Sequence, residues 1–265
     1  MKIFNPPLLL CLFWLTVSLA GLLFEPDIRR LDLEGAFATP SADFWLGQDE
    51  LGRSQLARLT YGARISLSVA LAVTLLSALI GIFIGALAGW QGGWVDHLLV
   101  RLIDIFMAFP GILLAIALAG ILGPGISNLV IALSVVGWVG FARLTRAQVL
   151  ALKHREHIQA AQSMGVKTAP IIRRHLLPLI AAPLIVEATS AMASIIIAEA
   201  GLSFLGIGIQ PPQASWGAMI RDGSRYLLIA PHMVLVPGIA LASLVYAINA
   251  LGDQLRDLND HRFVR

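Results

Sequence analysis

The chain has 265 residues, of which 57% are hydrophobic and only 13% are charged, and its formal net charge is +3. Soluble domains have about a quarter of their residues charged, so this composition excludes a globular protein with a polar surface in water. The apolar residues form continuous blocks rather than the alternating ~10-residue strands of a membrane β-barrel. Backbone groups in lipid must satisfy their own hydrogen bonds, so the blocks predict an all-α, polytopic membrane protein.

About six transmembrane helices are predicted, each near the ~20 residues that cross a bilayer. In chain order they cover about 6–24, 65–89, 102–122, 126–141, 179–202 and 228–251. The first block could instead be a cleaved signal peptide, but only Lys2 precedes it and no clear small-x-small site follows. We therefore expect residues 1–64 to hold the first helix and an outer polar segment, and residues 65–265 to form the transmembrane core.

Glycines and prolines within these blocks predict close helix packing and helix kinks. Gly81, Gly85 and Gly89 form a ridge that lets another helix approach closely, and packing within the chain is favoured over a dimer contact. Pro110 and Pro237 each remove a helical hydrogen bond, which predicts a kink at both positions.

Lys and Arg residues predict the orientation in the membrane. Twelve of the 19 lie on one side of the predicted spans, at the chain ends, at Arg101 and in the long loop of about 143–178. The other seven lie on the opposite side. The positive-inside rule places the long loop and both termini in the cytoplasm. A basic pI of about 9.4 is explained by these loops, so we expect no nucleic-acid partner.

The long loop has the pattern of two short helices. Residues 154–164 read as a helix that ends at Gly165, and a second helix can run from about Ala169 until Pro178 opens the next span. Together they predict a compact cytoplasmic projection with small residues at its tip, suited to the groove of a partner.

This loop resembles the "EAA" loop of permease subunits of bacterial ABC importers. The resemblance is carried by Ala160 and Ala161, then Gly165, then His175 to Pro178, with Gln159 where the family has Glu. Further stretches resemble the second permease of dipeptide, oligopeptide and nickel importers and follow that subgroup's order; they lie at 46–53, 62–67, 92–110, 199–217 and 251–257. Gln48 and Ser54 depart from the subgroup's usual Thr and Asp.

The resemblance implies the fold of a type I ABC importer permease in the bacterial inner membrane. It implies a second permease subunit, two ATP-binding subunits and an extracytoplasmic substrate-binding protein as partners. It also implies that the loop inserts into a groove on an ATPase; the coupling residues would be Glu156, Gln159, Ala160, Ala161, Gly165, His175 and Pro178. The chain has no Gly-x-x-x-x-Gly-Lys-Ser/Thr sequence, so we expect ATP hydrolysis in separate subunits, no catalytic residue and no cofactor.

Polar residues inside the predicted spans are costly and usually face the interior of a bundle. Arg101 and Asp104 are three residues apart, which predicts a local ion pair. Glu187, Glu199 and Asn249 are candidates for the translocation pathway or its outer gate, with structural anchoring as the alternative, favoured for Glu199.

Two other sets of residues have competing interpretations. Trp216 and Tyr226 lie in the outer loop 203–231, where they could dock a binding protein or simply lie at the membrane interface. His154 and His157 could hold a metal weakly, but their spacing with Glu156 matches neither metalloprotease motif. The chain's one cysteine, Cys11, excludes a cysteine-built metal site, so we expect no metal.

Three functional classes are compatible with a polytopic membrane protein. An integral-membrane enzyme would need a nucleophile–base or metal constellation at membrane depth, and a secondary transporter would need inverted repeats with broken helices. The sequence displays neither, which favours a permease of an ATP-driven importer. The motifs are shared by peptide and nickel importers; peptides are favoured over nickel or a metal chelate, and a gene neighbourhood with two ATPases would discriminate the classes.

Overall fold

The computed structural model describes residues 5–23 and 27–263, with side chains other than those of residues 22 and 259–263. The described part is helical apart from loops and one isolated bridge between Gln48 and Ser54. Lys2 and Arg265, which contributed to the predicted orientation, lie outside it, as does the side chain of Arg262. Its elements are α1 (Pro6–Leu23), a 3-10 turn η1 (Leu33–Gly35), α2 (Gln55–Gln91), α3 (Gly93–Met107), α4 (Gly111–Leu122), α5 (Ile126–Leu152), α6 (Glu156–Ser163), α7 (Thr168–Ile171), a π-turn η2 (Ile172–Leu176), α8 (Leu177–Phe204), α9 (Trp216–Ser224) and α10 (His232–Phe263).

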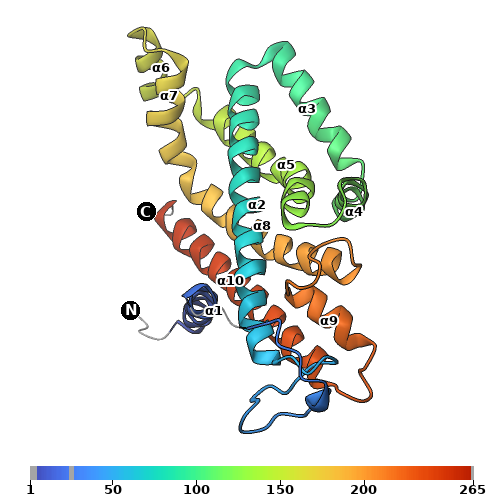
Figure 1. The fold of residues 1–265 in the computed structure, drawn as a ribbon. Coiled ribbons are helices and arrows are strands. Elements are labelled where there is room, and N and C mark those ends of the chain that lie inside the picture. Colours follow the sequence, from blue (N-terminus) through green and yellow to red (C-terminus); the bar gives the residue numbers. More distant parts are fainter. Residues whose placement is uncertain (1–4, 24–26, 264–265) are drawn as a thin grey trace.

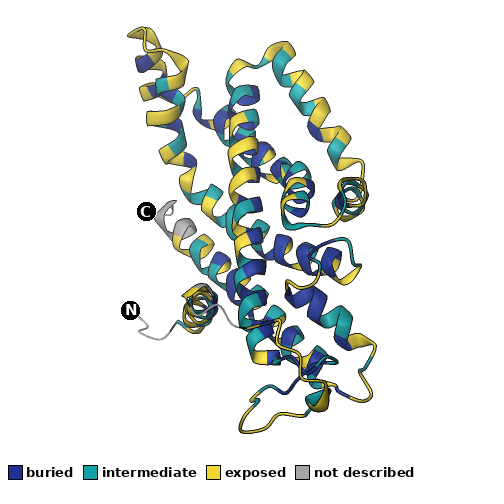
Figure 2. Ribbon diagram, viewed as in Figure 1, coloured by how far each residue is buried: buried dark blue, intermediate teal, exposed yellow. Residues whose placement is uncertain are grey.

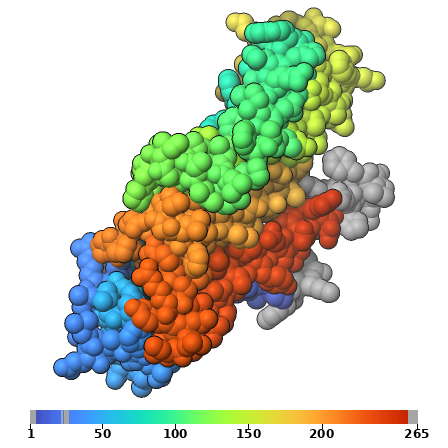
Figure 3. Space-filling model, turned by 90° about the vertical axis from the view of Figure 1, so that its right-hand side faces the viewer, coloured from blue at the N-terminus to red at the C-terminus, as the bar shows by residue number. Residues whose placement is uncertain are grey.

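The molecule is elongated, with α6 and α7 at one end and the outer segment with α9 at the other (Figure 1). The space-filling view shows the same long axis (Figure 3). Buried residues are frequent in α9 and where α2 packs against α5 and α8, whereas α3 and α6 are largely exposed (Figure 2). The all-α class is therefore confirmed, and a long two-ended body suits a chain that crosses a bilayer.

Four described helices are long and apolar enough to span a membrane, and a bent pair brings the number to five. The four are α2, α5, the continuous helix Thr168–Phe204 and α10, while Pro6–Gly21 of α1 is apolar but shorter. The expectation of about six crossings is thus reduced to four full-length helices, one broken helix and the shorter α1.

The third predicted span is broken rather than kinked. Helices α3 and α4 meet at 84° across a short break that contains Pro110. A proline donates no backbone hydrogen bond and disfavours helical geometry at the residue before it. One helix therefore ends at Met107, and Pro110 caps the next by accepting hydrogen bonds from the N–H groups of Leu113 and Leu114 at 2.9 and 3.2 Å.

Helix α2 begins ten residues earlier than predicted, at Gln55, so the boundary placed after residue 64 falls inside it. Ser54 explains the early start, because its side chain accepts a hydrogen bond from the N–H of Ala57 as a helix N-cap. Helix α5 also runs on to Leu152, so Arg143 and Arg146 lie on a helix and not in the loop.

Pro178 is the second residue of α8, where the sequence predicted it to open the next span, but α8 continues from the preceding turns as one helix from Thr168. The π-turn just before it is the physical reason. The N–H of Leu177 reaches back five residues to the carbonyl of Ile172, a wider turn that accommodates a proline without a break.

The glycine ridge packs within the chain, as favoured. A Cβ added at Gly81, Gly85 or Gly89 would press on successive turns of α5, from Trp138 to Val149. The absence of side chains thus lets the backbones of α2 and α5 come into contact.

Replacing Gly85 by Leu should separate α2 from α5. A Cβ at Gly85 would lie 2.8 Å from that of Thr145 and would also collide with the carbonyl of Ala142, which is backbone and cannot move aside. We expect the free energy of unfolding to fall by at least about 1–3 kcal/mol, measured as a lower melting temperature of the purified chain in detergent. Gly120→Leu is the matched control because nothing lies within 4 Å of its Cβ position; equal melting temperatures for the two variants would contradict this packing.

Candidate functional site

The loop between α5 and α8 is anchored to the helices on both sides of it. Ile158 and Ala161 of α6 are 0% and 3% exposed. They belong to a core cluster with Val149 of α5, Leu176 at the end of η2 and Ile180 of α8. This shared cluster packs α6 against the helices on both sides of the loop.

The tip of this loop is exposed and ends in a left-handed glycine. Gly165 has φ +78°, and the N–H of the following Val166 reaches the carbonyl of Ala161 at 3.1 Å, which closes the helix end. Met164 beside it is 76% exposed.

The predicted coupling residues do not share one surface. Glu156, Gln159, Ala160 and Pro178 are exposed and His175 is half-buried. The prediction that both alanines contact a partner needs correction. Ala161 is buried against the core, so only Ala160 offers a surface.

Two contacts that the sequence did not indicate brace this projection against the end of α2. Lys153 donates a hydrogen bond to the carbonyl of Gly89 at 2.9 Å, and Trp90 donates one to the hydroxyl of Thr168 at 3.2 Å. The tryptophan after the glycine ridge was the only available signal.

At the opposite end, a charged cluster joins the outer segment to α2 and α9. Asp49 is 0% exposed and pairs with Arg53 at 2.7 Å and with Arg58, which also reaches Asp222 of α9 at 3.3 Å. Burial raises the pKa of Asp49, but the charges and hydrogen bonds of Arg58 and Arg53 outweigh it and hold the pKa below its ordinary value. The outer segment is therefore tied to two helices by a buried carboxylate.

Several of the seven opposing Lys and Arg residues belong to this cluster. Arg53, Arg58 and Arg221 each lie within ion-pair distance of a carboxylate. These three arginines are therefore held within the cluster by carboxylates.

Glu199 lies in α8 and is 0% exposed. Its carboxylate accepts hydrogen bonds from Ser66 of α2 at 2.9 Å and from Ser203 at 2.8 Å. The residue thus connects α2 and α8 and offers no exposed surface to a passing solute in this conformation.

The sequence predicted that Trp216 could dock a binding protein, but in this conformation its side chain cannot contact one. Its side chain is 0% exposed, donates a hydrogen bond to the carbonyl of Leu59 at 3.1 Å and packs edge-on against Trp14 at 4.9 Å between ring centroids. Gly62 gives the indole its place, since a Cβ there would collide with it. Tyr226 is half-buried and packs on Phe37 of the outer segment, with centroids 4.8 Å apart.

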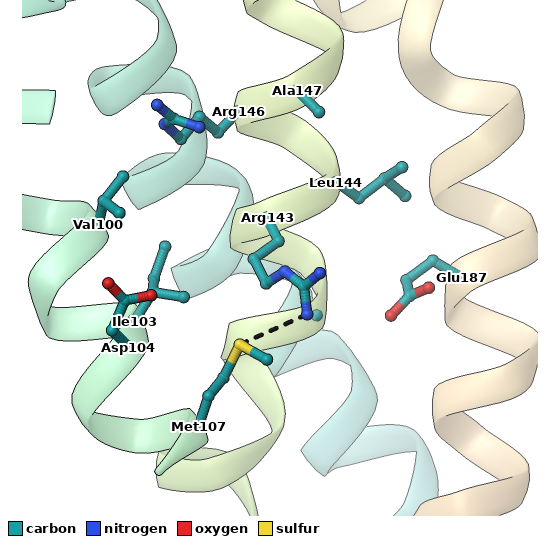
Figure 4. A pocket seen from close by; sticks show the side chains of 10 residues that line it. Val100, Ile103, Asp104, Met107, Arg143, Leu144, Arg146, Ala147 and Glu187 are labelled. Carbon is teal, nitrogen blue, oxygen red and sulfur yellow. Dashed lines mark hydrogen bonds between the residues drawn. The ribbon is translucent and has the colours of Figure 1, made fainter.

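Glu187 lines a cavity of ≈ 690 Å³ between α3, α5 and α8, drawn in Figure 4. It also lines a smaller cavity of ≈ 230 Å³ between α8 and α10, together with Asn249. Two of the three pathway candidates therefore meet at one place in the fold, although neither their spacing nor their periodicity indicated it.

The ion pair expected between Arg101 and Asp104 is absent from residues 5–23 and 27–263. The α3 carboxylate that does pair is Asp96, which holds Arg146 of α5 through two bonds of 2.5 and 2.7 Å. A bidentate pair between helices is better oriented than two long side chains one turn apart on an exposed face, and the fold makes it available.

Comparison with known proteins gives a consistent family. Residues 81–265 match the family model described as "Binding-protein-dependent transport system inner membrane component". The chain is 41% identical to the "Dipeptide transport system permease protein DppC" of Bacillus subtilis, over 97% of this chain and 81% of that protein. It is 39% identical to the protein of the same name from Alkalihalophilus pseudofirmus, over 94% and 82%. The "Glutathione transport system permease protein GsiD" of Shigella flexneri is 45% identical, over 83% and 73%.

A solved structure shares the fold. It is titled "Inward facing conformations of the MetNI methionine ABC transporter", and the match has a TM-score of 0.60 over 76% of this chain and 95% of that one. At 20% identity the likeness concerns the arrangement of helices alone.

Proposed function

This chain belongs to the family of binding-protein-dependent transport system inner membrane components, and from that premise we propose that it forms half of the translocation pathway of a peptide importer. It is a transmembrane permease subunit of an ATP-driven importer, and such a subunit works with ATP-binding subunits and a substrate-binding protein. The observation that carries the proposal is the agreement between the family match and the exposed, glycine-ended projection between α5 and α8.

The finer assembly is part of the proposal. A second, different permease would complete the pathway, and two ATP-binding subunits would bind the α6 projections on the cytoplasmic side, where both termini would also lie. The basic residues of the α5–α8 loop support this orientation. The chain itself would perform no chemistry, and ATP hydrolysis would take place in the partner subunits.

We assign coupling to the exposed tip, with Glu156, Gln159, Ala160 and Gly165 as contact residues. A groove that holds this tip would move α6 when the ATPase subunits close. The shared core of Ile158 and Leu176 would then move α5 and α8 as one unit. His175 and Pro178 lie behind the tip and would act by shaping the start of α8.

The outer parts have a different role in this proposal. Glu199 would anchor α8 to α2 and stay out of the pathway, because its carboxylate is occupied by two serine hydroxyls. Tyr226 and the outer segment would form the surface to which the binding protein docks, held in place by Asp49 and Arg58.

Peptides are the proposed cargo. The relatives whose names state a substrate are dipeptide and glutathione permeases, and both of those compounds are peptide-like. The shared sequence motifs also fit nickel importers, so nickel or a metal chelate is the competing cargo.

Uptake into proteoliposomes tests this function. The assembled transporter, with its binding protein outside and ATP inside, should accumulate radiolabelled dialanine, and a variant of the ATPase partner that cannot hydrolyse ATP should not. Accumulation of a nickel complex with no uptake of dialanine would replace the proposed cargo. Uptake without ATP would contradict the importer class.

A further inference from the structure

The cavity between α3, α5 and α8 carries charges of both signs from all three helices. Asp104 comes from α3, Arg143 from α5 and Glu187 from α8. Figure 4 shows Asp104 on one side of Arg143 and Glu187 on the other, with the Glu187 carboxylate pointing toward α5. Arg143 lies 17 residues along α5 from its first residue, Ile126, and Glu187 lies 17 residues along α8 from its last residue, Phe204. At 1.5 Å per residue, each lies about 26 Å along its helix from that end.

The charged groups of this cavity do not pair with one another. Within residues 5–23 and 27–263 neither Arg143 nor Glu187 forms an ion pair, and the Arg143 guanidinium donates only to the sulfur of Met107 at 3.4 Å. Arg146, the other arginine of the cavity, is already neutralised by Asp96. The cavity therefore keeps one cationic and two anionic groups available.

The backbone is arranged to admit the Glu187 carboxylate. Gly140 of α5 lies directly opposite, and a Cβ at that position would collide with Oε1 of Glu187. The carboxylate is thus held against α5, on the same helix face as Arg143 one turn away, rather than turned toward lipid.

Ionised side chains inside a membrane protein are costly unless they face water or a polar solute. A groove that keeps one guanidinium and two carboxylates unpaired is complementary to a molecule with both charges. A short peptide is such a molecule, because its carboxylate suits a guanidinium and its ammonium suits carboxylates. The volume of ≈ 690 Å³ falls within the range of about 300–1,000 Å³ typical of small-molecule sites.

We propose that this cavity is a transient binding site for the zwitterionic end groups of a short peptide during passage. Arg143 holds the terminal carboxylate, and Glu187 with Asp104 holds the terminal ammonium. The inference rests on the proposed peptide cargo. Glu187 also borders the smaller cavity that holds Asn249, so a peptide released from Arg143 has a second polar surface beside it.

Thiol protection in the assembled transporter tests the site. Ala147 lines the cavity and is exposed, and Cys11 is the chain's one cysteine. A Cys11→Ser, Ala147→Cys variant should react with a maleimide, and dialanine should slow that reaction about tenfold, as read by the mass of this chain. Adding Arg143→Gln or Glu187→Gln should remove the protection, whereas Arg101→Gln, on an exposed charge outside the cavity, should preserve it.

The outcomes separate this site from the cargo assignment. Dialanine uptake without protection, or protection that survives both cavity substitutions, would overturn the site and leave the peptide importer standing. An introduced thiol that never reacts would show that a partner subunit fills the cavity, which also overturns it. No dialanine uptake by the unmodified assembly would reject the proposed function and this site together.

Discussion

Replacing Gly165 by Trp is expected to abolish ATP-driven uptake while the chain still inserts into the membrane. Nothing lies within 4 Å of a Cβ at this exposed position, so the first atom of a new side chain meets no neighbour in the isolated subunit. The indole would project from the exposed tip of α6, where we place the ATPase groove. The left-handed backbone, φ +78°, adds a strain of about 1–2 kcal/mol for a residue with a side chain.

Two readouts check the result: uptake of labelled dialanine by the reconstituted transporter, and the amount of the chain in purified membranes. Gly165→Asn is the matched control, since asparagine tolerates the left-handed region and is small. It should retain most of the uptake. Normal uptake by the Trp variant would end the assignment of this tip as the coupling contact, and a loss of the chain from the membrane would attribute the defect to folding.

Replacing Asp49 by Ala is expected to release the outer segment from α2. Arg58 is 4% exposed and would keep only Asp222 at 3.3 Å, while Arg53 would lose its bond of 2.7 Å. Removing one member of a buried ion pair costs about 3–5 kcal/mol when the other charge is left without compensation. We expect the lower end of this range, because Asp222 and Glu50 still pair with Arg58 and Arg53. A lower melting temperature and faster protease cleavage between residues 27 and 54 would register the loss.

The exposed Asp43 supplies the control, since Asp43→Ala removes an equal charge from the same segment and should change neither readout. Replacing Asp49 and Arg58 together by apolar residues should recover part of the loss, because no buried charge is then left alone. The pKa of Asp49 is lowered in the fold. Its ion pairs therefore stabilise the protein above its unfolded pKa of about 3.9 and stop doing so as the pH falls through the lower folded value. Equal stability of the Asp49 and Asp43 variants at neutral pH would contradict the anchoring role.

The sequence by itself determined the fold class and most of the helices. Long apolar blocks must be helical in lipid because their backbone groups have no other hydrogen-bond partners, and the bounds of α1 and the start of α5 follow the predictions closely. Gly165 was also found correctly, because a glycine after a helix end is a local signal with a local cause. The resemblance to permeases was equally local, since it depends on short motifs.

Only the tertiary structure decided what each polar or aromatic side chain faces. Trp216 looked like a surface residue but fills a space beside Gly62, and Ala161 faces a core that α5 and α8 complete. Asp96 rather than Asp104 pairs with an arginine, 50 residues away. Arg143 and Glu187 line one cavity because α5 and α8 pack side by side over Gly140. The physical reason is common to all four cases: hydrophobic periodicity places a residue on a helix face, but its partner is chosen by which helices meet, and that depends on packing between distant segments.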